Sequence, residues 1–434
     1  MTTIKEDITM NTSPDRQAST IDKHLASANA LSHANKVLSI TLLVTLISVA
    51  GIALPYPILA PLFADGSSPL TQFLNLPSEL LLGVVLGIYP LGIILGSSVI
   101  GAISDNYGRK RLLTLTLIGS ALGYGLTAIA AIFENFLLFC LARLLTGLCE
   151  GNIAIARAIA ADLHPVIDKT RSFSLISSMG YGGYLLGPLA GGYLIMAGID
   201  AVFWIAALAC MLCALLSHFL LPKSLDVPDK HAEGGSSLTL LAQPDLRRFF
   251  LLYLFLTVGV NLYYEYYPLH LVREFSYQAV DISWATVFLT TCMIFTSLFI
   301  NPIIQKKLSH PHAGLLGMML FGSALAALPF FINQSYLISF ALMGAGIAIY
   351  NGFLPSYLSH SYEDRAQGKL MGMLVTIFCL GNLLAALIGG VLSMFDVQWA
   401  LLTGASITFV AGLIFYHGHF KAQIWPFVPT KKPA

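Results

Sequence analysis

Residues 143–165 read RLLTGLCEGNIAIARAIAADLHP, and residues 172–194 read SFSLISSMGYGGYLLGPLAGGYL, with a short polar link between them. Each stretch is long and apolar enough to cross a membrane as a helix. The first stretch places Arg143, Glu150 and Arg157 seven residues apart. Seven residues make almost two turns of a continuous helix, so this spacing predicts that the three charges project from nearly one face. Charges are costly in lipid, and we therefore expect this face to look into a protein interior or a watery cavity.

The second stretch is rich in small residues. Small residues at this spacing let two helices touch backbone to backbone, and a proline adds a bend. A charge-lined cavity beside a bendable, closely packed helix favours a transporter. The residues that form this hinge and packing pattern are Gly183, Gly187, Pro188, Gly191 and Gly192.

The composition indicates a protein that crosses a membrane many times. Of the 434 residues, 56% are hydrophobic and only 10% are charged, whereas soluble domains carry about 25% charged residues. The six cysteines lie inside apolar segments, so disulfides are not expected, and packing is the default reading of the Cys210–Cys213 pair. We expect a lipid bilayer as the environment and no nucleic acid as a partner.

The apolar segments predict an all-α membrane protein with twelve transmembrane helices. Residues 1–36 are polar and lack a signal-peptide core, so we expect a retained, disordered tail there. Each apolar segment is long enough to cross about 30 Å of hydrocarbon as a helix. The predicted spans are 37–63, 79–103, 112–133, 136–160, 173–197, 201–221, 248–272, 282–304, 313–332, 336–360, 370–394 and 399–417.

The positions of Lys and Arg predict the orientation. When the N-terminus is placed inside, all but three of the 23 Lys and Arg residues fall in the tails, cytoplasmic loops or central linker. The three exceptions are Arg273, in an outer loop, and Arg143 and Arg157, within a span. We therefore predict that both termini are cytoplasmic and that the chain lies in the inner (cell) membrane.

A polar stretch divides the chain in its middle. Residues 222–247 are rich in Pro, Gly and Ser, which predicts a cytoplasmic linker between bundles at 37–221 and 248–417, with a tail at 418–434. The small-residue pattern from Gly183 to Gly192 recurs from Gly381 to Gly390, 198 residues later and without its proline. Two parallel six-helix repeats are the expected origin of one large transporter fold.

The loop between the second and third predicted spans resembles a motif of the major facilitator superfamily. Residues 101–111 read GAISDNYGRKR, although Asn106 stands where a base is usual, and Arg143-x-x-Thr146-Gly147 resembles the family's Arg-x-x-Gln-Gly. The resemblance covers about residues 37–417 and implies two pseudo-symmetric six-helix bundles. It also implies that the loop is a conformational latch, with plain anchoring of basic residues as the alternative. The latch residues are Gly101, Asp105, Gly108, Arg109, Lys110 and Arg111.

The fifth span resembles the Gly-x-x-x-Gly-Pro-x-x-Gly-Gly motif that is typical of proton-coupled antiporters, including twelve-helix drug exporters. The resemblance implies that this helix meets the C-terminal half and that its bend controls leakage and conformational change. Plain packing is the alternative role for its glycines. The motif makes proton-coupled export the leading prediction.

Two readings of the charged stripe remain open. Arg143, Glu150 and Arg157 could form a structural ladder that neutralises itself within the bundle. Alternatively, Glu150 titrates and couples proton movement to transport. The resemblance places the first, fourth, seventh and tenth spans around a central cavity. The stripe is net positive when Glu150 is ionised, which favours an anionic or zwitterionic solute.

The other cavity-lining spans supply aromatic and polar candidates. Glu265 lies among four tyrosines and either faces the cavity or sits in water beside an interfacial aromatic belt. Tyr56, Asn261, Tyr350 and Asn351 suit walls that stack on, or hydrogen-bond to, a mid-sized organic molecule. The first span contains no acid, and this weakens the reading of a cationic drug as substrate.

These patterns predict a monomeric secondary active transporter and not an enzyme or a nucleotide-driven pump. No HExxH or Walker-type sequence occurs, and we expect no metal or nucleotide cofactor, with a proton gradient as the energy source. The leading mechanism is alternating access that exports a small organic solute in exchange for protons. The alternatives are proton-coupled uptake of an anionic metabolite, such as a carboxylate-type siderophore, and an uncoupled facilitator.

Overall fold

The structure of the chain is a computed structural model that describes residues 14–163, 165–167, 169–226, 237–331, 335–362 and 367–421. Within these ranges the regular structure is helical throughout. Ten helices are long and apolar enough to cross a membrane, and a shorter apolar helix covers Phe136–Cys149. The expectation of an all-α membrane protein is confirmed at this level.

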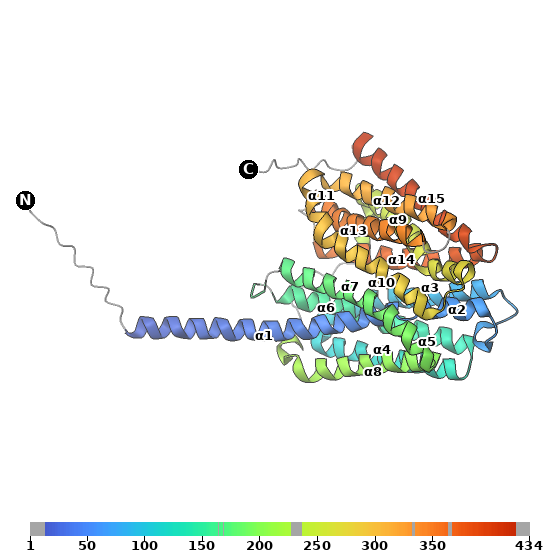
Figure 1. The fold of residues 1–434 in the computed structure, drawn as a ribbon. Helices are drawn as coiled ribbons and strands as arrows, with labels where there is room; N and C mark the ends of the chain where they lie inside the picture. The colour runs from blue at the N-terminus through green and yellow to red at the C-terminus, as the bar shows by residue number, and fades with distance from the viewer. Residues whose placement is uncertain are drawn as a thin grey trace, which may run out of the picture.

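The helices form two bundles that lie side by side, one from each half of the chain (Figure 1). The first bundle contains α1 (Pro14–Ala53), α2 (Tyr56–Asp65), α3 (Ser78–Tyr107), α4 (Arg109–Ile132), α5 (Phe136–Cys149), α6 (Asn152–Asp162), α7 (Lys169–Leu194) and α8 (Ile199–Leu220). The second contains α9 (Pro244–Phe275), α10 (Ala279–Phe295), α11 (Asn301–Lys307), α12 (His310–Ala327), α13 (Tyr336–Ser361), α14 (Gln367–Ser393) and α15 (Val397–Tyr416).

Helix α1 begins earlier than the sequence predicted. It starts at Pro14, and its first part extends beyond the bundle (Figure 1). The expectation of disorder is therefore wrong for residues 14–36, and residues 1–13 lie outside the described part. A helix that continues from an apolar span needs no new nucleation, because each added residue contributes a further hydrogen bond.

Two of the predicted spans are broken helices. The first span divides into α1 and α2 at Leu54–Pro55, where two prolines close together disfavour a continuous helix. The fourth span divides into α5 and α6 at Glu150–Gly151, and Glu150 leaves the helical conformation with ψ 33°. One continuous helix through Arg143, Glu150 and Arg157 is therefore wrong. Glu150 lies in a turn between two helices, and Arg157 belongs to the second of them.

Glycines set the distance between helices inside the first bundle. A Cβ on Gly147 of α5 would collide with the backbone carbonyl of Tyr89 on α3, and a Cβ on Gly183 of α7 would lie 2.9 Å from the backbone nitrogen of Ala50 on α1. Gly191 approaches the break between α1 and α2 in the same way, at the carbonyl of Leu54. Close backbone approach of this kind is what small residues permit in membrane bundles.

The two bundles touch at the end that carries the α2–α3 and α9–α10 connections. The contacts join α3 with α14, α7 with α10, and α2 with α9. Within the second bundle, Tyr266 on α9 donates a hydrogen bond to the carbonyl of Ala386 on α14, at 2.5 Å, and so holds α14 beside α9 at this end. A Cβ on Gly83 of α3 would lie 3.0 Å from the Cα of Gly390 on α14, so the halves meet backbone to backbone there.

Candidate functional site

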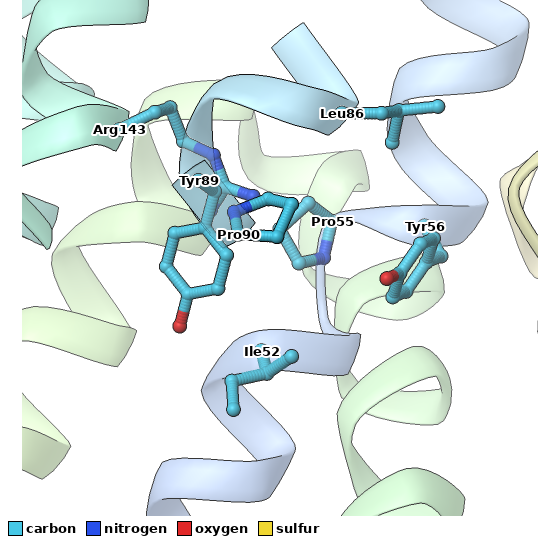
Figure 2. Close-up of a pocket in the computed structure, with 7 residues that line it drawn as sticks. All are labelled: Ile52, Pro55, Tyr56, Leu86, Tyr89, Pro90 and Arg143. Carbon is cyan, nitrogen blue, oxygen red and sulfur yellow. The ribbon is translucent and has the colours of Figure 1, made fainter. Parts of the chain in front are cut away.

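The turn between α1 and α2 faces Arg143 across a small enclosed space. This cavity has a volume of about 10 Å³, which is roughly the space for one water molecule. Figure 2 shows that its residues come from both sides of the α1–α2 break and from α3 and α5. The lining residues are Ile52, Pro55, Tyr56, Leu86, Tyr89, Pro90 and Arg143.

Arg143 is a buried cation held mainly by an aromatic ring. Its side chain is 3% exposed, and its Cζ lies 4.3 Å from the centroid of the Tyr89 ring. Its Nε and Nη1 atoms have no hydrogen-bond partner among the described residues. A guanidinium over an aromatic face is stabilised by the ring quadrupole, yet its donors stay available for an incoming acceptor.

Glu150 is the buried acid of the same half. It is 4% exposed, and its Oε1 accepts a hydrogen bond from the Tyr124 hydroxyl at 3.4 Å. Its Oε2 has no partner among the described residues, and Tyr89 and Asn152 lie close to its carboxyl group. No ion pair joins Glu150 to Arg143 within the described part of the chain. The helix break gives Glu150 a position that a straight helix would not.

Arg157 lies apart from these two residues. Its side chain is exposed, and it interacts electrostatically with Tyr184 on α7 and with Tyr253 on α9, which belongs to the other half. A side chain that is exposed and yet has neighbours in both halves faces the space between the bundles. The three charges therefore do not form one stripe, and only Arg143 and Glu150 are buried together.

The second half contributes a buried acid and two amides. Glu265 on α9 is 2% exposed, and neither of its carboxyl oxygens has a partner among the described residues. Asn382 on α14 donates from Nδ2 to Oδ1 of Asn261 at 3.3 Å, and Asn261 donates to the carbonyl of Thr257 at 2.9 Å. Both Asn382 and Glu265 lie near the Tyr56 side chain from the first half. Tyr56 thus links the two sets of polar residues.

The tyrosines around Glu265 are core residues. Tyr263, Tyr266 and Tyr267 are at most 1% exposed, so the alternative of an interfacial aromatic belt with Glu265 in water is wrong. Tyr350 on α13 is 4% exposed and lies near Tyr264. Asn351 is half-buried next to it in the chain.

The structure describes the surroundings of four of the six residues predicted to form a latch. Arg109 forms an ion pair from Nε to Oδ2 of Asp162 at 3.1 Å, which joins the start of α4 to the end of α6. Lys110 donates to the carbonyl of Leu221 at 2.6 Å, and Arg111 is exposed. Gly108 has φ 92°, a left-handed backbone that favours glycine and separates α3 from α4. Gly101 and Asp105 belong to α3, but the side-chain surroundings of that stretch lie outside the described part.

Sequence reasoning missed three residues of this site, namely Tyr89, Tyr124 and Asn382. Each is a polar residue inside an apolar span, and such residues in membrane helices usually face the bundle interior. That signal could have found Asn382, which follows Gly381 of the repeated small-residue pattern. The two tyrosines give no such signal, because their rings are also ordinary packing residues.

Comparisons with known proteins agree with this architecture. The family model described as Major Facilitator Superfamily matches residues 38–306 and 249–432. The chain is 24% identical to the tetracycline resistance protein, class H, of Pasteurella multocida over 88% of this chain and 94% of that protein. It is 22% identical to multidrug resistance protein 2 of Bacillus subtilis (strain 168), over 79% and 86%. A bacterial homolog of the human lysosomal transporter Spinster, solved in an inward-facing and occupied conformation, superposes with a TM-score of 0.73 at 13% identity, over 92% of this chain and 99% of that one.

Proposed function

The chain belongs to the major facilitator superfamily, and on this premise we propose that it exports a small organic solute in exchange for protons. It is a secondary transporter and a multi-pass protein of the inner membrane, not an enzyme. The relatives named for tetracycline and multidrug resistance support export of a drug-like compound.

The observation that carries the proposal is a pair of buried acids, one in each half. Glu150 and Glu265 are at most 4% exposed, and three of their four carboxyl oxygens lack a partner among the described residues. An isolated buried carboxylate is costly, so each acid favours its neutral, protonated form in this conformation. When water reaches the group in another conformation, the charged form becomes favourable and the proton leaves. This alternation is what coupling requires.

The conformation itself supports alternating access. With both termini in the cytoplasm and twelve spans, the contacts of α3 with α14 and of α7 with α10 lie on the outer side. The described state is then closed outward, with Arg157 facing the inner side. Outward opening would part these contacts and hydrate Glu265, which lies on α9 near Tyr56.

The solute would meet Arg143 and the tyrosines. The free Nε and Nη1 donors of Arg143 suit a carboxylate, enolate or carbonyl oxygen. The rings of Tyr56, Tyr264 and Tyr350 suit an aromatic or other flat ring system. A zwitterionic ring compound of the tetracycline kind fits both requirements. The positive charge of Arg143 also favours the second candidate function, which is uptake of an anionic metabolite. The direction of proton flow relative to the solute distinguishes export from uptake.

The proposal is tested with purified protein in liposomes that contain a pH-sensitive dye. Tetracycline, an organic carboxylate and the cation ethidium are added in turn, with Glu150→Gln as the coupling variant and Glu134→Gln, an exposed acid, as the matched control. If export is coupled to protons, tetracycline and protons should move in opposite directions across the membrane in wild type and in Glu134→Gln. This exchange should be absent in Glu150→Gln. Proton flux in the same direction as a carboxylate would establish uptake, and transport of any solute without proton flux would establish a facilitator.

A further inference from the structure

A second cavity lies in the C-terminal half, away from the site described above. It has a volume of about 180 Å³ and is lined by the segment Thr296–Ile300, which follows α10, and by α11, the start of α12 and the end of α13. Five of the eight lining residues carry polar side chains. The lining residues are Ser297, Asn301, Pro302, Gln305, His310, Gly352, Phe353 and Ser356.

Two histidine rings meet at the edge of this cavity. The centroids of His310, on α12, and His360, on α13, are 5.3 Å apart, and the planes of the rings differ by 35°. The His310 ring also packs edge-on against Phe353, with 5.7 Å between centroids. His310 is half-buried and His360 is exposed, so the pair is accessible from water.

The corresponding place in the first half is an ion pair. Arg109 begins α4 and pairs with Asp162 at the end of α6. His310 begins α12, and His360 lies 198 residues after Asp162, the interval that also separates Gly183 from Gly381. By the same interval Lys307 corresponds to Arg109, so the cation is kept and a histidine replaces the acid of the ion pair. The ring that faces His360 is a second imidazole, that of His310, and two neutral imidazoles do not form an ion pair with each other.

The hydrogen bond of His360 determines which ring nitrogen carries the proton. Its Nδ1 lies 2.7 Å from the backbone carbonyl oxygen of Ser356, so Nδ1 carries the proton and Nε2 is left as an acceptor. A ring nitrogen bonded to a backbone carbonyl, with the other nitrogen free, is the usual arrangement of a metal-binding histidine.

The spacing of the rings suits one bridging ion. Zinc–nitrogen bonds of about 2.0–2.1 Å at a tetrahedral angle place two imidazole centroids about 5.2 Å apart. Among the described residues no third His, Cys, Asp or Glu completes a cluster. Asn301 is 9% exposed, and its Oδ1 has no hydrogen-bond partner among the described residues, whereas its Nδ2 donates to the carbonyl of Ala348 at 3.0 Å. The cavity also holds the Gln305 side chain and room for water.

We propose that His310 and His360 bind a divalent transition-metal ion of the zinc type, which joins the start of α12 to the end of α13. Imidazole ligands select zinc, nickel and copper over magnesium and calcium. Water from the cavity completes the coordination. Lys306 and Lys307, which follow Gln305 on α11, are exposed, so their charges are screened by salt.

The test uses full-length detergent-purified protein that carries no polyhistidine tag. Zn²⁺ binding is measured by calorimetry, and Co²⁺ binding by its visible absorption, in wild type, His310→Asn, His360→Gln and the control His218→Asn. His218 is exposed on α8 and lies far from the cavity in the chain. We expect one site in wild type and in the control, and a loss of affinity of at least about tenfold in each of the other two variants.

A thermal measurement separates lost ligands from a damaged fold. Zn²⁺ should raise the Tm of wild type and His218→Asn, because it binds the folded state alone. Without metal, His360→Gln should have the same Tm as wild type. Zn²⁺ should not raise the Tm of this variant. Absence of Zn²⁺ binding in wild type, or Zn²⁺ binding with wild-type affinity in both His310→Asn and His360→Gln, would overturn the proposal.

Discussion

Ser283 on α10 donates a hydrogen bond from Oγ to the backbone carbonyl of Pro188 on α7 at 2.7 Å, and this bond joins the two halves of the transporter. Pro188 cannot occupy a helix without freeing a carbonyl one turn earlier, and its own carbonyl here accepts a bond from the opposite bundle. The antiporter-like motif of the fifth span therefore contacts the C-terminal half directly, and its glycines decide how closely α10 approaches.

Replacement of Gly192 should keep the outer end from closing. A Cβ at this position would collide with Ser283 Oγ and lie 2.7 Å from the carbonyl of Ala279. We expect Gly192→Val to shift the population towards the outward-open state. Spin labels at the exposed residues Met196 and Glu274 should then report longer distances. Gly180→Val is the matched control, because a Cβ there meets nothing within 4 Å. Equal distance distributions for both variants would show that α7 and α10 do not control closure.

The ion pair between Glu79 on α3 and Arg273 at the end of α9 should act as a weak clasp across the halves. The two side chains are 19% and 34% exposed, and pairs of this kind contribute about 0.2–1 kcal/mol. Glu79→Gln should therefore change the ratio of closed to open states by at most about fivefold. The exchange Glu79→Arg with Arg273→Glu should restore the ratio in the same spin-label measurement. Failure of the exchanged pair to restore the ratio of closed to open states would contradict this account.

The aromatic ring of Tyr89, more than its hydroxyl, should hold Arg143. The guanidinium carbon lies 4.3 Å from the ring centroid, and the Tyr89 hydroxyl makes no hydrogen bond among the described residues. Tyr89→Phe should bind tetracycline nearly as wild type does. Tyr89→Leu removes a contact that contributes about 0.5–2 kcal/mol and leaves Arg143 free to move. We expect weaker tetracycline binding in Tyr89→Leu, measured by titration of the intrinsic tyrosine and tryptophan fluorescence. An equal loss of tetracycline affinity in Tyr89→Phe and Tyr89→Leu would show that the hydroxyl matters more than the ring.

Asn382 should position Asn261 beside the buried acid of the second half. Asn382→Ala leaves Asn261 Oδ1 without its donor, and an unmade buried hydrogen bond costs about 1–3 kcal/mol. We expect a lower Tm and slower transport. Asn382→Gln keeps the donor and should recover part of both. The opposite result, an unchanged Tm with Asn382→Ala, would mean that the amide pair is not formed in the protein's resting state.

Much of the fold could be predicted from the sequence because the signals are local. Apolar length predicts spans, and small residues such as Gly183 and Gly187 predict the faces along which helices approach. The breaks were missed. Whether the helix breaks at Glu150 depends on the side chains of α3 and α4 that pack around this residue. The periodicity of apolar residues in the sequence contains no information about that packing. Once the helix breaks, spacing by seven no longer means a shared face, and Arg157 separates from Arg143.

The site could be predicted in part, because a charged residue within a membrane span by itself indicates a position that faces the protein interior. Arg143, Glu150 and Glu265 are such residues, and all three are buried. Their partners were less accessible to sequence reasoning, because Tyr89 and Asn382 acquire a role through tertiary packing of α3 and α14. Proximity of Tyr56 to Glu265 joins positions more than two hundred residues apart, and only the arrangement of the two halves brings them together.

The central claim is that Glu150 carries the proton that drives export. The most direct measurement compares two modes of tetracycline transport in liposomes, namely accumulation driven by a pH gradient and exchange of labelled for unlabelled tetracycline at equal pH. Wild type and the surface control Glu134→Gln should perform both. Glu150→Gln, which keeps the shape of the side chain and cannot release a proton, should retain exchange and lose gradient-driven accumulation. Accumulation at the wild-type level in Glu150→Gln would contradict the account and leave Glu150 as a structural acid.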